Sequence, residues 1–267
     1  PVNKNAKGAR MGTVGKALEL LDLFTHRQPQ MGLSQIAREA GLNKATCHRL
    51  LTEMQSRGLV EQTGSAREYR LGPAVLRLAS LREAAVPMRE AAMPPLRALA
   101  EATGETAHLS HLVAGRLQTL AFAYSARHAM AVRMEDADFL PFHATASGLV
   151  VLAHLPQAIS ETILTAHLPK MTPATGTDPD RIRALLPAIR ARGHAETDST
   201  FEPGVHGIAL PLFDAQSACA GSIAVATPTA RMSDEQRRLT LAELARAAAE
   251  ITKVWGGQLP PGPDTLN

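Results

Sequence analysis

Residues 44–57 carry side chains of the types that hydrogen-bond to nucleic-acid bases. The apolar residues of this stretch recur at spacings of three and four, which predicts a helix with one buried side. At about 100° per residue, the opposite side carries Ala45 and Arg49, flanked by Thr46 and His48. Arginine forms paired hydrogen bonds with guanine, threonine and histidine reach base edges, and an alanine methyl contacts thymine. This pattern predicts contacts with bases in the major groove of DNA.

Two more helices and a hairpin are predicted around this stretch. Residues 12–26 show helical spacing of apolar residues, and a second helix is expected to open at Ser34 as its N-cap and to end at Gly41. Asn43 is the expected N-cap of the third helix, and residues 59–71 form two short strands around a polar loop. This order is typical of a winged helix-turn-helix, whose third helix enters the major groove by its N-terminal end.

The remaining polar residues of this arrangement suit contacts with phosphates, which position a protein on DNA without specifying a sequence. The alternative, a small helical domain whose basic residues are merely solvated, has less support because caps, turn, hairpin and charge agree. The predicted DNA-binding residues are Ser34, Asn43, Lys44, Ala45, Thr46, His48, Arg49, Ser65, Arg67 and Arg70.

Charge is distributed unevenly along the 267 residues. Residues 1–90 hold 14 of the 28 Lys and Arg but only 8 of the 25 Asp and Glu, a formal charge of +6. The rest of the chain carries −3, for a net charge of +3. A basic front end joined to a mildly acidic body predicts two domains with different partners, the basic one suited to a polyanion.

Composition excludes several classes of protein. Two cysteines are too few for a disulfide scaffold or a four-cysteine zinc site, and 3% aromatic residues argue against a stacking surface for single-stranded nucleic acid. The chain shows no long apolar run and no signal-peptide pattern, so we expect a soluble cytoplasmic protein with no membrane partner.

The body of the chain mixes helices with antiparallel hairpins, which predicts an α+β fold. Helices are expected at residues 96–102, 147–155 and 181–192 and, capped by Ser233, up to about Trp255; strands are expected at 106–112, 117–123, 207–213 and 220–227. Because Pro87 and Pro94-Pro95 interrupt the chain, we place the domain junction at residues 84–93. The predicted organisation is a flexible arm (1–10), the winged domain (11–72), a linker helix (73–92), a second domain (93–255) and a flexible tail (256–267).

No catalytic, cofactor or metal motif stands out. The phosphate-binding, dinucleotide-binding and zinc-protease patterns are absent, and Ser147 lies in Ala-Ser-Gly rather than in a nucleophile elbow. His108 and His111 are three residues apart on a predicted strand, so they should point to opposite faces rather than share a metal. We therefore expect no enzyme activity, no cofactor and no metal.

Residues 145–148 predict a ligand site at a helix start, because free N–H groups attract a carboxylate and small side chains let it approach. Asp198 and His206 flank a glycine-bearing loop that we expect nearby. On the residues alone, two alternatives stay open: Ser147 and Gly148 only permit close packing, and His206 only occupies a loop.

Two separated stretches resemble one protein family. Residues 33–51 (LSQIAREAGLNKATCHRLL) resemble the helix-turn-helix of IclR-family transcriptional regulators, and 58–60 and 69–73 match the family's wing and linker start. Residues 143–148 (HATASG) look like the entry to the family's effector-domain helix, and 201–209 (FEPGVHGIA) with 213–214 look like its second signature. The resemblance covers about residues 11–255.

The resemblance implies a GAF-like effector domain that binds a small organic acid, and a dimer or dimer of dimers. Some relatives carry polar residues on the strand 223–226, where this chain has the methyl groups of Ala224 and Ala226. This difference favours a larger, partly apolar acid, with aromatic acids among the candidates. Leu120 and Val132 are candidate apolar walls, with ordinary core packing as their alternative role. The implied effector-binding residues are Ala146, Ser147, Gly148, Asp198, His206, Gly207, Ala224, Ala226, Met134 and Leu140.

The sequence is compatible with three functions. The first is a regulator of transcription that binds operator DNA as a dimer, paired along Val75, Leu78 and Leu81 of the linker helix, with a small acid altering its DNA affinity. The second is a small-molecule hydrolase with an accessory nucleic-acid-binding head, using Ser147 and His143 with Asp198. The third is an architectural DNA protein, which would have no use for so large an acidic body.

Overall fold

The computed structural model describes residues 12–25, 28–64, 67–85, 87–128, 131–133 and 139–258. The chain divides into two compact units, Pro1–Val86 and Pro87–Asn267. The predicted arm, most of the predicted tail, and the predicted site residues Ser65 and Met134 lie outside the described residues.

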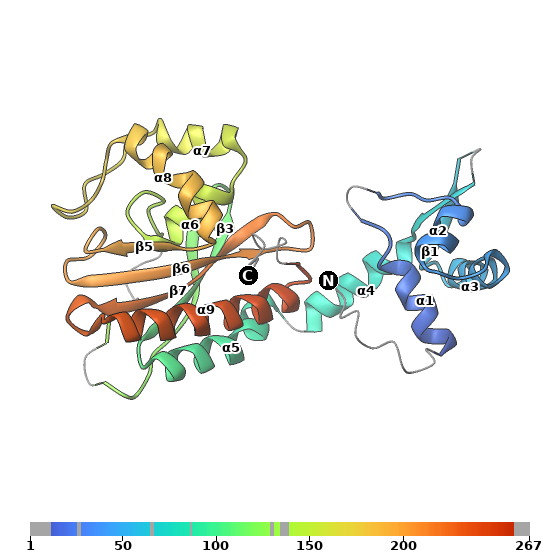
Figure 1. Cartoon of the computed structure of the whole chain (residues 1–267), viewed down its shortest axis with the longest axis horizontal. Helices are drawn as coiled ribbons and strands as arrows, with labels where there is room; N and C mark the ends of the chain where they lie inside the picture. Colours follow the sequence, from blue (N-terminus) through green and yellow to red (C-terminus); the bar gives the residue numbers. More distant parts are fainter. Residues whose placement is uncertain are drawn as a thin grey trace. The chain divides into compact units, whose positions relative to one another are not determined.

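The first unit has the predicted winged helix-turn-helix architecture (Figure 1). Leu20, Ile36, Cys47 and Leu51 from its helices are fully buried and share one core with Tyr69 of the hairpin. The elements are α1 (Thr13–Leu21), α2 (Leu33–Glu39), α3 (Lys44–Ser56), the paired antiparallel strands β1 (Val60–Thr63) and β2 (Glu68–Leu71), and α4 (Pro73–Ala85).

The turn between α2 and α3 follows its predicted chemistry. Gly41 ends α2 in the left-handed region (φ +65°), which glycine adopts without strain. Asn43 then caps α3, because its Oδ1 accepts the backbone N–H of Thr46 at 2.8 Å. These two residues fix where the third helix begins.

The expected N-cap of α2, Ser34, is wrong by two residues. The helix begins at Leu33, its N-cap is Gly32, and no side chain caps it. The reason is tertiary, since the chain before the helix is held by the wing. Met31 exchanges two backbone hydrogen bonds with Tyr69, at 3.0 and 2.8 Å, and this pairing holds the chain next to the hairpin just before the helix.

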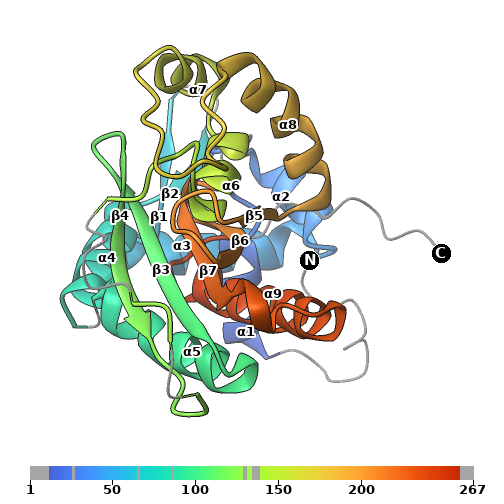
Figure 2. The same ribbon diagram turned by 90° about the vertical axis from the view of Figure 1, so that its left-hand side faces the viewer.

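The second unit is a five-stranded antiparallel sheet with helices on both faces, which confirms the predicted α+β architecture. Helices α5 and α9 pack against one face, and α6 and α8 lie on the other (Figure 2). The sheet order is β4-β3-β7-β6-β5. The elements are α5 (Met88–Thr103), β3 (Thr106–Val113), β4 (Arg116–Ala123), α6 (Ala146–His154), α7 (Gln157–Leu164), α8 (Pro179–Arg192), β5 (Ala195–Asp198), β6 (Val205–Phe213), β7 (Cys219–Pro228), a short 3-10 turn at Thr229–Arg231, and α9 (Asp234–Val254).

Helix α5 corrects the expectation that Pro94 and Pro95 interrupt the chain. Both prolines lie inside a continuous helix that starts after Pro87. A proline removes one helical hydrogen bond, but α5 buries Leu96 and Leu99 against α9 and the sheet, and this burial outweighs the local cost. Pro87, at the N-cap, marks the break between α4 and α5.

Ser233 caps α9 as predicted, accepting the backbone N–H of Gln236 at 3.1 Å. Helix α7 and strand β5 were not predicted. Strand β5 has only four residues, and its backbone pairs with β6 alone. Within the described residues, no helix combines the length and the apolar character that crossing a membrane requires.

Candidate functional site

The outward side of α3 carries the predicted base-contacting residues. Ala45, His48 and Arg49 are exposed, and Thr46 is half-buried beside them. Opposite them, Cys47, Leu50, Leu51 and Met54 are buried in the core of the first unit, as the spacing predicted. Within the described part of the chain, the Arg49 guanidinium has no hydrogen-bond or ion-pair partner, so it is available to an incoming ligand.

The wing presents its two arginines differently. Arg67 is exposed at the hairpin turn, where its carbonyl accepts a hydrogen bond from Gln62 Nε2 at 2.7 Å. Arg70 faces Glu61 across the strands and binds that carboxylate at 2.6 Å. Ser34 on α2 and Lys44 on α3 are also exposed. Asn43 is exposed, but its Oδ1 already serves as the helix cap.

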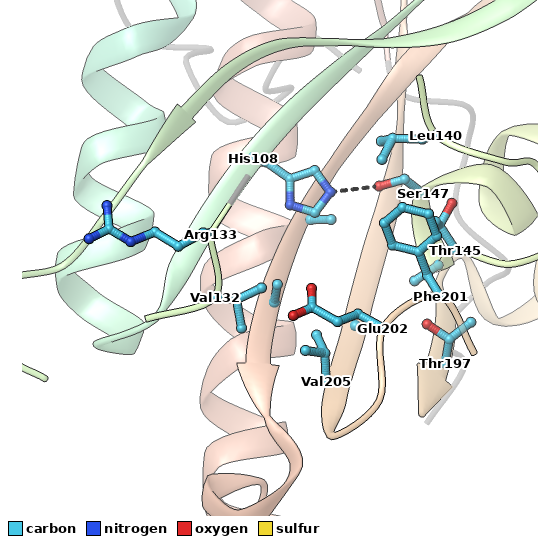
Figure 3. Close-up of a pocket in the computed structure, with 14 residues that line it drawn as sticks. His108, Val132, Arg133, Leu140, Thr145, Ser147, Thr197, Phe201, Glu202 and Val205 are labelled. Atoms are coloured by element: carbon cyan, nitrogen blue, oxygen red, sulfur yellow. Dashed lines mark hydrogen bonds between the residues drawn. The ribbon is translucent and has the colours of Figure 1, made fainter. Parts of the chain in front are cut away.

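The second unit contains a cavity between the sheet and the start of α6 (Figure 3). Its wall combines small and apolar side chains with a few polar ones. The lining residues are His108, Val132, Arg133, Leu140, Thr145, Ala146, Ser147, Thr197, Phe201, Glu202, Val205, Gly207, Ala224 and Ala226. The structure thus brings six of the predicted effector residues together: Leu140, Ala146, Ser147, Gly207, Ala224 and Ala226.

The start of α6 is built to leave two N–H groups open. Thr145 caps the helix by accepting the Gly148 N–H at 2.9 Å, and its hydroxyl donates to the Pro141 carbonyl at 2.9 Å. The N–H groups of Ala146 and Ser147, both residues that line the cavity, have no partner among the described residues. Such groups carry the positive end of the helix dipole and favour an anion.

Gly148 does not line the cavity, contrary to the expectation. A Cβ at this position would lie 2.4 Å from Phe142 Cα and 2.5 Å from the Pro141 carbonyl oxygen. The glycine is therefore there for the close approach of the segment before α6. The alternative of close packing alone therefore holds for Gly148, whereas Ser147 lines the cavity.

His108 is a cavity residue that the sequence did not reveal. It lies on β3 with its ring against α6, and Nε2 is 3.1 Å from Ser147 Oγ. Burial lowers the pKa of its imidazole to about 4, so the ring is neutral at physiological pH. His111 lies on the other side of the strand, 5.9 Å from the Trp255 ring, as the alternation predicted.

The segment that carries Phe201 and Glu202 is anchored by three hydrogen bonds just before it. Thr172 Oγ1 donates to the Ser199 carbonyl at 2.6 Å, and Thr175 Oγ1 donates to the Thr200 carbonyl at 2.6 Å. Thr200 in turn donates to the Ala144 carbonyl, just before α6, at 2.6 Å. These bonds hold one wall of the cavity against the helix start.

Three expected contacts are corrected. Asp198 is not at the cavity, because its Oδ1 accepts from Ser199 Oγ at 2.8 Å and Thr229 Oγ1 at 2.9 Å. His206 faces the opposite side of β6 from Gly207, and its Nε2 lies 3.5 Å from a carboxylate oxygen of Glu196. Leu120 packs into the core beneath α5 and α9. Val132, by contrast, does line the cavity.

The catalytic set considered for a hydrolase is not assembled. His143 Nε2 donates to the Pro169 carbonyl at 2.8 Å, while Ser147 contacts His108 and Asp198 is occupied elsewhere. Among the described residues, no group of three His, Cys, Asp or Glu is placed to hold a metal.

The depressed pKa of His108 predicts an acid-sensitive stability. Below pH 6.5 the unfolded chain binds a proton that the folded ring accepts only near pH 4. The contribution of this residue to stability is therefore full above pH 6.5 and is lost as the pH falls towards 4. We expect His108→Gln to lose less stability than the wild type between pH 7 and pH 4, measured by urea unfolding. His111 and His154, whose pKa values burial also lowers, contribute equally in both proteins, so parallel pH profiles would contradict this assignment.

Family models match both units. Residues 13–64 match the model described as IclR helix-turn-helix domain, and residues 83–253 match the model described as bacterial transcriptional regulator IclR C-terminal. Among curated proteins, the HTH-type transcriptional regulator BhcR of Paracoccus denitrificans (strain Pd 1222) is 31% identical, over 89% of this chain and 85% of that protein.

Solved structures give the same likeness. A crystal structure of an IclR transcriptional regulator from Silicibacter sp. TM1040 is 48% identical, with a TM-score of 0.87, and covers 94% of this chain and 98% of that one. An IclR homologue from Microbacterium hydrocarbonoxydans, complexed with 4-hydroxybenzoate, is 25% identical with a TM-score of 0.57, and covers 91% of this chain and 99% of that one.

Proposed function

The chain belongs to the IclR family of DNA-binding transcriptional regulators, and on that premise we propose that a small organic acid, bound in the cavity below α6, alters its affinity for operator DNA. The observation that carries the proposal is the pair of open N–H groups at Ala146 and Ser147, inside a cavity otherwise walled largely by apolar and small side chains. The carboxylate of the acid binds these N–H groups, and its apolar part lies against Ala224 and Ala226.

Several observations support an acid with a ring. Gly207, Ala224 and Ala226 give the centre of the cavity floor no side chain larger than a methyl group, so this part suits a flat apolar body. The Microbacterium hydrocarbonoxydans relative holds 4-hydroxybenzoate, an aromatic acid. The acid acts by population shift, since it changes DNA affinity only to the extent that it binds one arrangement of the DNA-binding units better than another.

On the DNA side, Arg49 recognises a base and Arg67 contacts a phosphate. Arg49 is exposed at the third-helix face and unpaired in the described chain, which suits the paired bonds that guanine offers. Arg70 has less capacity for a phosphate, because it already binds Glu61. The other contacts proposed are Ser34, Asn43, Lys44, Ala45, Thr46, His48 and Ser65. We also propose that the protein acts in the cytoplasm, where it has access to DNA.

The regulator acts as a dimer, or as a dimer of dimers, because one winged unit contacts too few base pairs for specificity. Two copies pair along α4, where Leu78 and Leu81 are 47% and 57% exposed. Sedimentation of the full chain as a monomer at micromolar concentration, with and without operator, would contradict this pairing.

The test of the proposed function combines ligand binding with operator binding. A thermal-shift screen with aliphatic and aromatic carboxylic acids should reveal at least one acid that raises the melting temperature, because a ligand stabilises the state it binds. The same acid should change the affinity for an operator selected from a random-sequence library by the wild-type protein. Absence of any such acid would refute the effector proposal.

Ser147→Ala separates this proposal from the hydrolase alternative. In that alternative Ser147 is the nucleophile, and His108, whose Nε2 is 3.1 Å from Ser147 Oγ, is the neighbouring base. A regulator with this substitution keeps its operator affinity without the acid and needs a several-fold different acid concentration for its response. An enzyme with Ser147 as nucleophile would instead lose a measurable turnover of ester or amide substrates.

A further inference from the structure

One ring nitrogen of His108 faces the cavity side without a partner. The residue is 7% exposed, and among the described residues Nδ1 accepts and donates no hydrogen bond. Figure 3 shows this nitrogen on the side of the ring where Val132 and the carboxylate of Glu202 lie. A buried polar atom left unpaired costs about 1–3 kcal/mol, so a ligand that pairs with Nδ1 gains affinity by removing this cost.

The direction of Nδ1 is fixed by what holds the ring. Nε2 is 3.1 Å from Ser147 Oγ, and β3 is hydrogen-bonded to β4 on one side and β7 on the other. Nδ1 is therefore held in place as a second contact point for a ligand, separate from the N–H groups of α6.

The charges around this contact point select the chemistry of its partner. Burial lowers the pKa of His108 to about 4, so the imidazole is neutral and offers no charge to a carboxylate. Glu202 is exposed at the mouth of the cavity, and its negative charge repels a second carboxylate. Arg133 gives no counterbalance, since its guanidinium lies 5.6 Å from the Tyr124 ring and extends away from the cavity in Figure 3.

A hydroxyl group meets both demands. It donates to the Glu202 carboxylate, and it either accepts from or donates to Nδ1, whichever tautomer the Ser147 contact selects. An ammonium group would also attract Glu202, but it would lose most of its hydration beside Val132, Val205 and Ala226.

The floor of the cavity sets the shape of the ligand between these two contact points. Gly207 on β6 pairs directly with Ala226 on β7, and Ala224 pairs with His108 on β3. Gly207, Ala224 and Ala226 have no side chain larger than a methyl group, so this part of the floor is flat along the sheet and admits a planar ring.

We propose that the effector is a planar carboxylic acid that carries a hydroxyl group, and that His108 Nδ1 and Glu202 together recognise this hydroxyl. The inference rests on the proposed function, because it places the carboxylate of the same ligand at Ala146 and Ser147. It adds a specificity determinant, His108, that distinguishes a hydroxy acid from the plain acid and from a dicarboxylic acid.

The test is calorimetric titration of the full chain with benzoate, the three monohydroxybenzoates, isophthalate and terephthalate. At least one hydroxybenzoate should bind the wild type tenfold or more tighter than benzoate and than either dicarboxylate. His108→Gln keeps an amide near the Nε2 position but none at Nδ1, so its preference for the hydroxyl should fall to about one. His108→Asn keeps an amide near Nδ1 and should retain the preference within threefold, as should the control His111→Gln on the opposite face of β3.

Each other outcome counts against the inference. Benzoate or a dicarboxylate binding as tightly as every hydroxybenzoate would overturn it, as would a full preference in His108→Gln. If that variant does not fold, Glu202→Gln decides, since it should weaken the hydroxyl preference and tighten terephthalate binding. If none of the six acids binds, the inference fails alone, provided that an aliphatic acid still shifts operator affinity; the proposed function fails only if no acid does.

Discussion

Replacing Gly148 by alanine should destabilise the second unit by about 3 kcal/mol and abolish its response to any acid. The added Cβ would lie 2.4 Å from Phe142 Cα and 2.6 Å from the Phe142 carbonyl oxygen, and backbone atoms cannot give way as a flexible side chain can. The segment before α6 must therefore move. That movement breaks the bond from Thr145 Oγ1 to the Pro141 carbonyl and displaces the start of α6, where Ala146 and Ser147 line the cavity.

Thermal unfolding of the Gly148→Ala protein measures the effect, with a melting temperature lower by roughly 10 °C for a unit of this size. Gly176→Ala is the matched control, because a Cβ there meets no atom within 4 Å and the backbone is not in the left-handed region. It should melt within about 2 °C of the wild type. A Gly148→Ala protein that also melts there, and still responds to an acid, would contradict the role given to this glycine.

The elements of this chain were predictable where short-range chemistry decides them. Asn43 and Ser233 cap their helices through side-chain bonds to N–H groups three residues on, and these bonds need no tertiary partner. Gly41 ends its helix by a backbone preference of its own. Ser34 shows the limit, since the start of α2 is set by backbone bonds between Met31 and Tyr69, which are distant in sequence.

The candidate site was predictable only in part, for two physical reasons. His108 gains its role from Ser147, 39 residues away, and from strand pairing with β7, more than a hundred residues away; a histidine in an apolar strand gives no local sign of either. His206 and Gly207 were both expected at the ligand, but both lie on β6, where neighbouring residues point to opposite faces. Extending the predicted strand back to Val205 would have assigned only Gly207 to the cavity.

Arg49→Ala should weaken binding to the selected operator at least tenfold while leaving binding to random DNA nearly unchanged. A paired arginine–guanine contact contributes about 1–3 kcal/mol of discrimination, and a dimer that uses both of its heads loses it twice. Arg49 suits this task because it is exposed on the outward side of α3 and, in the described chain, has no carboxylate to compete for it. Fluorescence anisotropy with both DNAs, over a series of salt concentrations, measures the two losses separately.

Two variants make this prediction specific. Arg49→Lys keeps the charge but removes the planar fork, so it should lose operator affinity almost as Arg49→Ala does, with an unchanged salt dependence. Arg67→Ala removes a charge from the exposed hairpin turn, so it should weaken both DNAs by a similar factor and make the salt dependence shallower by about one counterion per subunit. Equal losses on both DNAs for Arg49→Ala and Arg67→Ala would mean that Arg49 contacts phosphate and that another residue of α3 recognises the base.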